Sequence, residues 1–230
     1  MTLKPGDIIA YLEMCNEEET NLQHGMNFRL HGGLSVILMS TRPGAPYADR
    51  VEEDGRILIY EGHDIPRHVG GLDPKTVDQP MRNPGGSMSR NGRFYEAALR
   101  YKKSGGEPEL VKVYERIRPG WVYNGIFKLV DSWLEETAGR KVFKFRLEIT
   151  EGEPLAGRSE GPPDHTRMIP TTVKLEIWKR DKGQCVLCGS RQNLHYDHII
   201  PYSKGGSSSY PENIRLLCAR HNLMKSDRIE

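Results

Sequence analysis

The stretch CVLCGSRQNLHYDHIIP, residues 185–201, gathers several metal-binding side chains into a short length of chain. Two cysteines stand three positions apart, and a His-Tyr-Asp-His run follows at 195–198. Further along, the segment CARH at 218–221 forms a second pair with the same spacing. Thiolates and imidazoles in two such pairs are the ligands with which zinc fills a closed tetrahedral site. The sequence therefore predicts a structural zinc ion bound by Cys185, Cys188, Cys218 and His221.

Four polar residues remain after that assignment: His195, Asp197, His198 and Asn222. On an extended strand, side chains two positions apart point to the same side, as His195 and Asp197 would. In the last helix, expected over 219–227, Asn222 is rotated about 100° from His221 and faces the strand. Asp197 and Asn222 thus offer oxygen ligands to a hard cation, and a neutral histidine beside them accepts a proton from water. This combination predicts phosphodiester hydrolysis.

The segments DHIIP at 197–201 and CARHN at 218–222, with Asn213 and Lys225, resemble the HNH endonuclease family. The resemblance covers residues 171–230 and implies a ββα-metal fold stabilised by the zinc. The alternative without catalysis is a zinc-ribbon binding module in which Asp197 and His198 only form hydrogen bonds.

The resemblance also implies a role for each polar residue. His198 is the general base, and Asp197 and Asn222 bind the catalytic Mg²⁺ or Mn²⁺. Asn213 holds the loop that aims the imidazole of His198. His195 lies near the scissile phosphate.

The organisation of the chain indicates two domains. Residues 151–170 contain four prolines and three glycines without a helical or strand period, which predicts a stiff linker. It divides a domain at 1–150 from one at 171–230. The second domain holds ten Lys and Arg against six Asp and Glu, although the whole chain has a net charge of only +2. This asymmetry hints at a polyanionic partner, although a solvated surface explains it equally well.

The first domain is expected to be mostly β-structure. Apolar residues alternate with charged ones through KVFKFRLEI at 141–149, the pattern of a half-buried strand. One amphipathic helix is predicted at 91–103 with Asn91 as its N-cap, and another at 171–181 capped by Thr171 or Thr172. We predict an α+β protein with a strongly curved sheet or barrel. Further strands are expected at LSVILMS, RILIY, LVKVYERI and WVYNGIFKLV.

The segments at 44–55, 58–64, 121–133 and 141–147 resemble the SRA domain, in this order along the chain. This domain is also called YDG, after a tripeptide written here as Tyr123-Asn124-Gly125. The resemblance runs from about residue 4 to 150 and implies a barrel-like sheet that binds duplex DNA and flips out 5-methylcytosine or a related base. Asn in place of Asp suits a turn, because Asn tolerates a positive φ.

A flipped cytosine needs aromatic faces and a polar partner for its exocyclic amino group. By position in the motifs, Tyr47 and Tyr60 are the stacking pair, unless they are buried core residues. The family places an aspartate three residues after the first tyrosine, where this chain has Arg50. We therefore expect Asp49 to read the base, with Glu61 as the alternative.

Two long segments, 15–33 and 63–92, lack a clear period and are expected to reach the DNA grooves. Their candidate contacts, each of which is otherwise a solvated charge, are His24, Arg29, Arg67, Arg82 and Arg90. Lys225 either contacts phosphate or ends a helix in solvent.

A base reader joined to a nuclease is similar to a modification-dependent restriction endonuclease. We expect a homodimer, because one HNH site cuts one strand. The alternatives are an HNH nuclease of another specificity and a non-catalytic reader of modified DNA. The longest apolar stretch, 34–39, is too short to cross a bilayer, and the first residues lack the apolar core of a signal peptide, so a cytoplasmic protein is expected.

Overall fold

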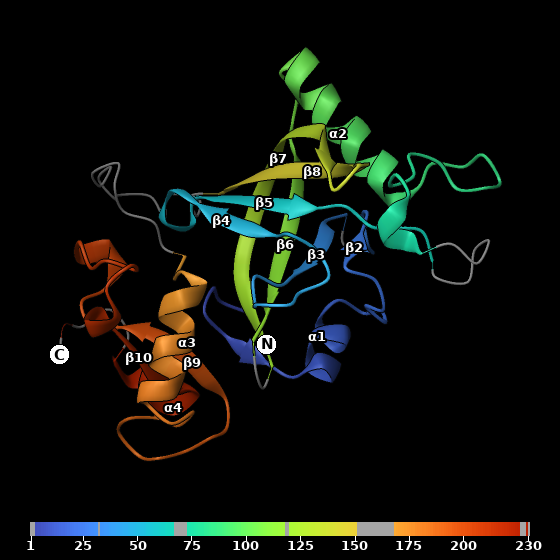
Figure 1. The fold of residues 1–230 in the computed structure, drawn as a ribbon. Coiled ribbons are helices and arrows are strands. Elements are labelled where there is room, and N and C mark those ends of the chain that lie inside the picture. The colour runs from blue at the N-terminus through green and yellow to red at the C-terminus, as the bar shows by residue number, and fades with distance from the viewer. Residues whose placement is uncertain are drawn as a thin grey trace.

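The computed structural model describes residues 3–31, 33–66, 73–117, 120–150 and 168–225, together with Ile229. These residues form one sheet of eight strands and a separate sheet of two, each packed against helices (Figure 1). The strands of the large sheet are β1 (Ile8–Ile9), β2 (Met26–Asn27), β3 (Ser35–Met39), β4 (Arg50–Glu52), β5 (Ile57–Glu61), β6 (Glu109–Arg116), β7 (Trp121–Thr137) and β8 (Arg140–Ile149). The small sheet contains β9 (Leu194–His198) and β10 (Ile214–Cys218). The helices are α1 (Tyr11–Glu17), α2 (Arg90–Ser104), α3 (Thr171–Arg180) and α4 (Ala219–Lys225).

The large sheet is mixed and open. Its strand order is β2-β3-β6-β7-β8-β5-β4, with β1 added to β7, and β3 runs parallel to β6. A barrel requires every strand to pair on both sides, but β2 and β4 end the order. The predicted mixture of helices and strands is confirmed. Of the two predicted forms, a curved sheet or a barrel, the barrel is wrong, because the sheet of the described residues is not closed.

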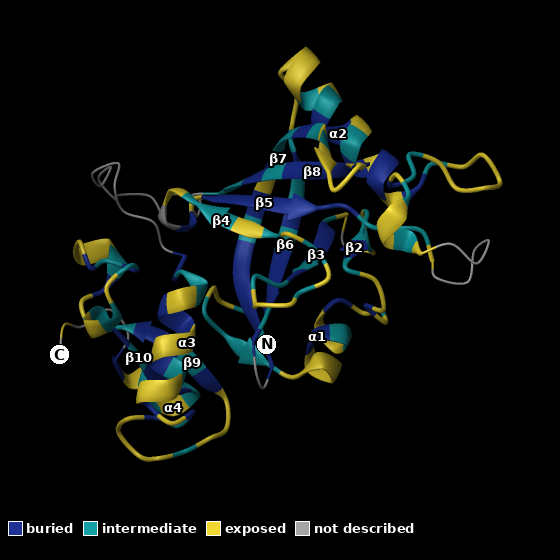
Figure 2. Ribbon diagram, in the orientation of Figure 1, coloured by how far each residue is buried: buried dark blue, intermediate teal, exposed yellow. Residues whose placement is uncertain are grey.

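The alternation in β8 is confirmed on its apolar side. Phe143, Phe145 and Leu147 are buried in the main core, against which α2 packs Phe94 and Ala98. The polar side of β8 differs from expectation, because Lys144 is also buried and its Nζ lies 2.8 Å from the Glu61 carboxylate. Figure 2 shows this burial running along β5, β7 and β8.

Both predicted helices exist, but their caps differ from the prediction. Ser89 is the N-cap of α2, and its hydroxyl accepts a hydrogen bond from the Gly92 amide at 3.1 Å. Asn91 is instead buried inside the first turn. The N-cap of α3 is Pro170, and no side chain caps that helix. Proline serves there because its φ suits the start of a helix.

The strand expected at WVYNGIFKLV is confirmed as part of β7, and the tripeptide Tyr123-Asn124-Gly125 lies within it without forming a turn. Val113 pairs with Gly125 and Tyr114 with Tyr123, so Asn124 is the additional residue of a β-bulge. Gly125 has φ +104°, which a bulge tolerates at glycine. Tyr123 is a buried core residue.

The small sheet shares its core with the large one. Apolar side chains of α3, β9 and β10 pack together with Ile117 and Val122, which belong to the large sheet and its margin. Residues 151–167 of the predicted linker lie outside the described residues, but Met168 and Ile169 at its end are buried. None of the described helices has the length and apolar composition needed to cross a membrane.

Candidate functional site

The predicted zinc ligands lie together. Cys185 and Cys188 stand in the turn after α3, Cys218 ends β10, and His221 lies in the first turn of α4. Their donor atoms all fall within 4.8 Å of one another. The sulfurs of Cys188 and Cys218 are 3.8 Å apart, and the Cys185 and Cys218 sulfurs each lie 3.4 Å from His221 Nδ1. A tetrahedral zinc with bonds of about 2.3 Å separates its sulfur ligands by roughly 3.8 Å. The cluster therefore fits a structural zinc ion.

The protonation of Cys185 agrees with this role. Burial by itself raises the pKa of the thiol, but backbone hydrogen bonds at Cys218, Leu187 and Cys188 and a side-chain bond to His221 lower it to about 6. The thiolate is the form of cysteine that binds metals.

Asp197 lies on β9 outside the zinc cluster. Its carboxylate is nearly buried and contacts Lys225 Nζ at 3.0 Å and Arg215 Nε at 3.4 Å. Lys225 is itself 4% exposed and also donates to the backbone carbonyl of His198. Lys225 is thus not a solvated helix end. The ammonium of Lys225 lies against the Asp197 carboxylate, at the position where a divalent ion is expected to bind.

His198, the last residue of β9, is held by a serine. Its Nε2 lies 2.8 Å from the hydroxyl of Ser208, which is 2% exposed. Ser208 is the middle one of three consecutive serines in the loop between β9 and β10. Sequence reasoning did not identify it, because only the folded loop determines which of the three reaches the imidazole.

Asn213 closes the same loop. Its side-chain oxygen accepts from the Ile200 amide at 2.8 Å, and its amide donates to the carbonyls of Ile200 at 3.2 Å and Ser207 at 3.0 Å. A Cβ added at Gly206 would lie 1.8 Å from the Ile200 carbonyl oxygen, so only glycine fits there. The loop that carries Ser208 is therefore tightly constrained.

Asn222 lies on α4, three residues before Lys225, and is half-buried. Side chains three apart are neighbours on a helix surface. Because Lys225 contacts Asp197, this spacing places Asn222 on the part of α4 that meets β9.

His195 faces the large-sheet part of the chain. Its Nδ1 lies 2.6 Å from the carboxylate of Asp7, and the two residues also form an isolated antiparallel bridge. Within the described residues, the buried Nε2 of His195 has no hydrogen-bond partner. His195, which was expected to lie near a phosphate, thus joins the small sheet to the segment before β1.

The aromatic residues predicted to bind a base lie together with an unpredicted histidine. The rings of Tyr47 and His63 are stacked, with centroids 5.6 Å apart and planes 14° apart. The Tyr60 hydroxyl lies 3.1 Å from His63 Nε2. Asn91 bonds both backbone groups of His63 at 2.8 Å. Burial lowers the pKa of His63 to about 4, aided by the charges of Arg90 and His24, so the imidazole is neutral at physiological pH.

The two candidate base-reading carboxylates have different surroundings. Asp49 accepts backbone hydrogen bonds from Ser40 and Glu61, each at 3.0 Å, and so joins the ends of β3 and β5. Burial raises the pKa of Asp49 to about 7, although those two bonds oppose the shift. Glu61 is buried and paired with Lys144. Both carboxylates are therefore engaged with protein groups in this structure.

The predicted DNA contacts are mostly exposed. Arg90 begins α2, and Arg82 donates to the Gly86 carbonyl within a turn. His24 lies in the segment before β2, and its pKa is lowered by burial and by Arg90. Arg29 is paired with Glu109 at 2.9 Å. Arg67 lies outside the described residues.

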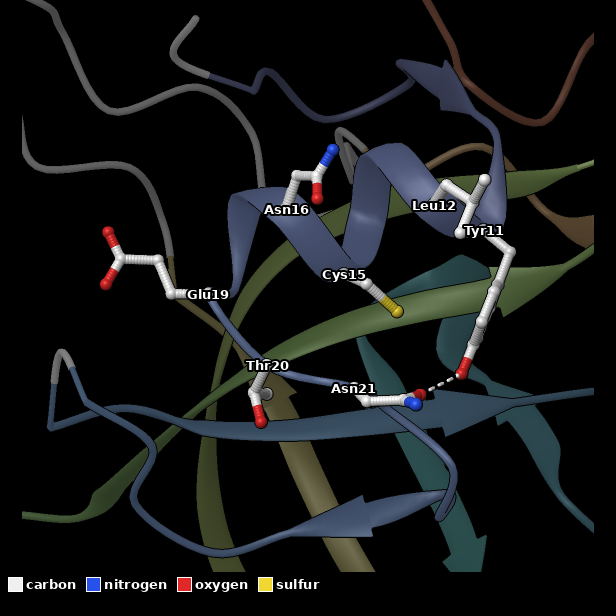
Figure 3. Close-up of a pocket in the computed structure, with 7 residues that line it drawn as sticks. All are labelled: Tyr11, Leu12, Cys15, Asn16, Glu19, Thr20 and Asn21. Atoms are coloured by element: carbon white, nitrogen blue, oxygen red, sulfur yellow. Dashed lines mark hydrogen bonds between the residues drawn. The ribbon is translucent and has the colours of Figure 1, made fainter.

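A hollow beside α1 is the remaining candidate (Figure 3). It is lined by α1 and the turn that follows, and the Tyr11 hydroxyl donates to Asn21 across it at 2.8 Å. No residue of the zinc cluster, of the Asp197–His198 pair or of the tyrosine pair lines it. The hollow is therefore separate from the predicted chemistry.

Comparisons with known proteins agree with this division of the chain. Residues 185–228 match the family model described as HNH endonuclease, so this segment is an HNH endonuclease domain and a phosphodiester hydrolase by class. Two curated proteins match at low identity. The chain is 25% identical over 265 residues to the histone-lysine N-methyltransferase family member SUVH2 of Arabidopsis thaliana, covering 94% of this chain. It is 26% identical over 161 residues to the CRISPR-associated endonuclease Cas9 of Corynebacterium diphtheriae, covering 66% of this chain. The chain spans only 37% and 13% of their respective lengths.

Two solved structures align with the chain. The SRA domain of SUVH5, in complex with hemi-methylated CG DNA, aligns with a TM-score of 0.48 and 21% identity over 67% of this chain and 93% of that one. The modification-dependent TagI restriction endonuclease aligns with a TM-score of 0.40 and 21% identity over 96% of this chain and 76% of that one. Residues 185–228 thus carry an HNH endonuclease domain.

Proposed function

We propose that this protein is a modification-dependent DNA endonuclease. Its large sheet binds duplex DNA and receives a flipped 5-methylcytosine or related base, and its HNH domain hydrolyses the DNA backbone. The observation that carries the proposal is the arrangement at the end of β9. His198 and Asp197 lie together there, outside the four residues that fit zinc, and Asn213 holds the adjoining loop.

The contacts of His198 suggest how it acts as a base. If Nε2 donates its hydrogen to Ser208 across their 2.8 Å contact, Nδ1 is the basic nitrogen of the imidazole. A water molecule beside Nδ1 would then transfer a proton to His198 as its oxygen attacks the phosphorus. The bond from phosphorus to the departing ester oxygen breaks at the same step, and that oxygen takes up a proton from solvent. Ser208 acts by fixing the tautomer and the orientation of the ring.

Asp197 and Asn222 would hold the catalytic divalent ion through a carboxylate and an amide oxygen, a donor set that suits Mg²⁺ or Mn²⁺. Such an ion supplies positive charge to the scissile phosphate. Lys225 Nζ, now 3.0 Å from Asp197, has to turn away from the carboxylate, which brings its charge toward the DNA. Lys225 thereby becomes available as a phosphate contact.

In this proposal Tyr47 and Tyr60 recognise the flipped base. Tyr60 is 3% exposed and belongs to the main core, as the alternative reading of this residue expected, whereas Tyr47 is half-buried. In the proposal both offer aromatic faces once neighbouring groups make room, and Glu61 or Asp49 accepts the exocyclic amino group of cytosine. His63 lies against Tyr47 and bonds Tyr60, so it must shift or become part of the wall when the base enters. A methyl group in an apolar pocket is worth about 1–3 kcal/mol, roughly 10–200-fold. Discrimination against unmodified cytosine is therefore real but incomplete.

A homodimer is the simplest assembly for double-strand cleavage. Each HNH site cuts one strand, and a two-fold axis relates two sites to the two antiparallel strands. A monomer of this protein would nick the DNA.

The deciding experiment compares one plasmid in 5-methylcytosine-containing and unmodified forms, incubated with the protein and Mg²⁺ or Mn²⁺. We expect cleavage of the modified plasmid at least 10-fold faster than of the unmodified one. Equal cleavage of both forms would indicate an HNH nuclease of another specificity. Selective binding of modified DNA without cleavage under any divalent ion would indicate a non-catalytic reader.

A further inference from the structure

A fully buried polar cluster joins the two parts of the molecule. Glu115 of β6 and Asn124 of β7 face Lys174 and Thr171 of α3. Lys174 Nζ donates to the Glu115 carboxylate at 2.8 Å and to the side-chain oxygen of Asn124 at 2.6 Å. Glu115, Asn124 and Lys174 are each no more than 2% exposed. A buried ammonium and carboxylate in such contact hold two surfaces in one arrangement.

Asn124 completes this cluster in two directions. Its side-chain amide donates to Glu115 Oε2 at 3.1 Å, while its side-chain oxygen accepts from Lys174. A primary amide does both through separate atoms, since its nitrogen donates and its oxygen accepts. The β-bulge contributes as well, because Asn124 is the additional residue of β7 and a bulge redirects its side chain.

The cluster is electrically balanced only with an amide at this position. One carboxylate faces one ammonium, and Asn124 is neutral. An aspartate there, as in the Tyr-Asp-Gly form of the tripeptide, would put a second buried carboxylate beside Glu115 and remove the donor between them. Burial alone raises the pKa of Glu115, but the charge of Lys174 and hydrogen bonds from Lys174, Thr171 and Asn124 hold it below its ordinary value.

Other contacts extend the same junction. The Tyr196 hydroxyl on β9 donates to the Lys174 carbonyl at 2.9 Å, and the Tyr196 amide donates to the Gly6 carbonyl at 3.3 Å. The Asp7–His195 pair lies beside them. The small sheet is thus attached to the large one through a helix, a strand and a shared apolar core.

We propose that Asn124 is a positioning residue: with Glu115 it forms a socket for Lys174 that locks the nuclease domain to the base-reading domain, so that the DNA is cut at one fixed distance from the modified base. The predicted effect on DNA cleavage rests on the proposed function. The lock itself depends only on the contacts among Glu115, Asn124 and Lys174.

The test exchanges the carboxylate of Glu115 and the amide of Asn124. Asn124→Asp places two carboxylates against one ammonium, and Glu115→Gln leaves Lys174 without a carboxylate. The double variant, Glu115→Gln with Asn124→Asp, restores one negative charge, because the carboxylate and the amide exchange places and the amide still donates to the carboxylate. We expect each single variant to lower the melting temperature by on the order of 10 °C and the double variant to recover most of that loss. Lys102→Gln, which breaks an exposed pair with Asp131, is the matched control and should change little.

The functional readout is a duplex with one 5-methylcytosine, cut in Mg²⁺ and mapped to the nucleotide on both strands. Wild-type protein and the double variant should cut each strand at sites that spread over one or two nucleotides. The single variants should cut at sites spread over a wider range, or should not cut at all. A double variant as unstable as the single ones, or single variants that cut as narrowly as wild type, would overturn the proposal. If wild-type protein cuts no DNA, the proposed function fails, but recovery of the melting temperature still decides whether the lock exists.

Discussion

The proposed nuclease site and the proposed base-reading site of this protein are built from different kinds of contact. In the proposed nuclease domain, the residues assigned to metal binding and catalysis come from two short segments, 185–198 and 218–225. Ser208 and Asn213, in the loop between β9 and β10, position them. In the base-reading domain, Tyr47 and Tyr60 are surrounded by groups from distant segments, such as Asn91 and Lys144. Local spacing therefore determines the first site, whereas packing determines the second. Four experiments test that contrast, beginning with the largest expected effect.

Loss of a zinc ligand should have the largest effect. Cys218→Ser removes one of four ligands from a site whose metal contributes about 10–16 kcal/mol to the folding of isolated zinc fingers. We expect the variant to lose bound zinc, the cooperative unfolding of the small sheet and all nuclease activity. Cys15→Ser alters a cysteine outside the cluster and is the control. A Cys218→Ser protein that keeps one zinc per chain by elemental analysis would refute the assignment.

Removal of the proposed base should have the next largest effect. His198→Ala is expected to lower the cleavage rate by about 10²–10⁴-fold, the usual contribution of a general base. Binding of modified DNA, measured by fluorescence anisotropy, should stay within about twofold, because the base-reading residues lie on the other domain. Ser208→Ala keeps the imidazole and should cause a smaller loss. Unchanged cleavage by His198→Ala would exclude this residue from the mechanism.

The buried carboxyl of Asp49 predicts a pH dependence that belongs to the base-reading domain. Its pKa is about 7 in the folded protein and about 3.9 in an unfolded chain. The folded state therefore binds more protons between these values, so its stability falls as pH rises from about 4 to about 7, by at most about 4 kcal/mol. Denaturant unfolding of wild type and Asp49→Asn across this range should give diverging curves. Parallel curves would show that Asp49 is ionised throughout.

The smallest expected effect concerns base stacking. Tyr47→Ala should weaken binding of a 5-methylcytosine duplex by about 5–150-fold, since stacking of one base on an aromatic ring is worth about 1–3 kcal/mol. Tyr47→Phe keeps the ring and should bind nearly as wild type does. Equal affinity of Tyr47→Ala for the modified duplex would place the flipped base elsewhere.

The secondary structure of the small domain was predictable almost completely. The strand that carries His195 and Asp197 and the final helix were expected from the sequence, and the structure contains them as β9 and α4. The cap of α2 was mispredicted, because Ser89 and Asn91 both suit an N-cap and the choice depends on a tertiary contact between Asn91 and His63. The bulge at Tyr123-Asn124-Gly125 was not predicted for a similar reason, since a bulge inside a long strand uses the same residues as a turn.

The sequence alone predicted the four residues that the structure brings together as a metal cluster, and it supplied the proposed composition of the nuclease site. Residues such as Cys185 and Cys188, or Asp197 and His198, are held close by the chain itself, so their spacing reveals their chemistry. Only the tertiary structure decided that Asn124 faces Lys174, that Glu61 is paired with Lys144 and that His63 stacks on Tyr47. These partners are brought together by the burial of apolar surface throughout the fold. No local sequence pattern predicts which residues become partners in this way.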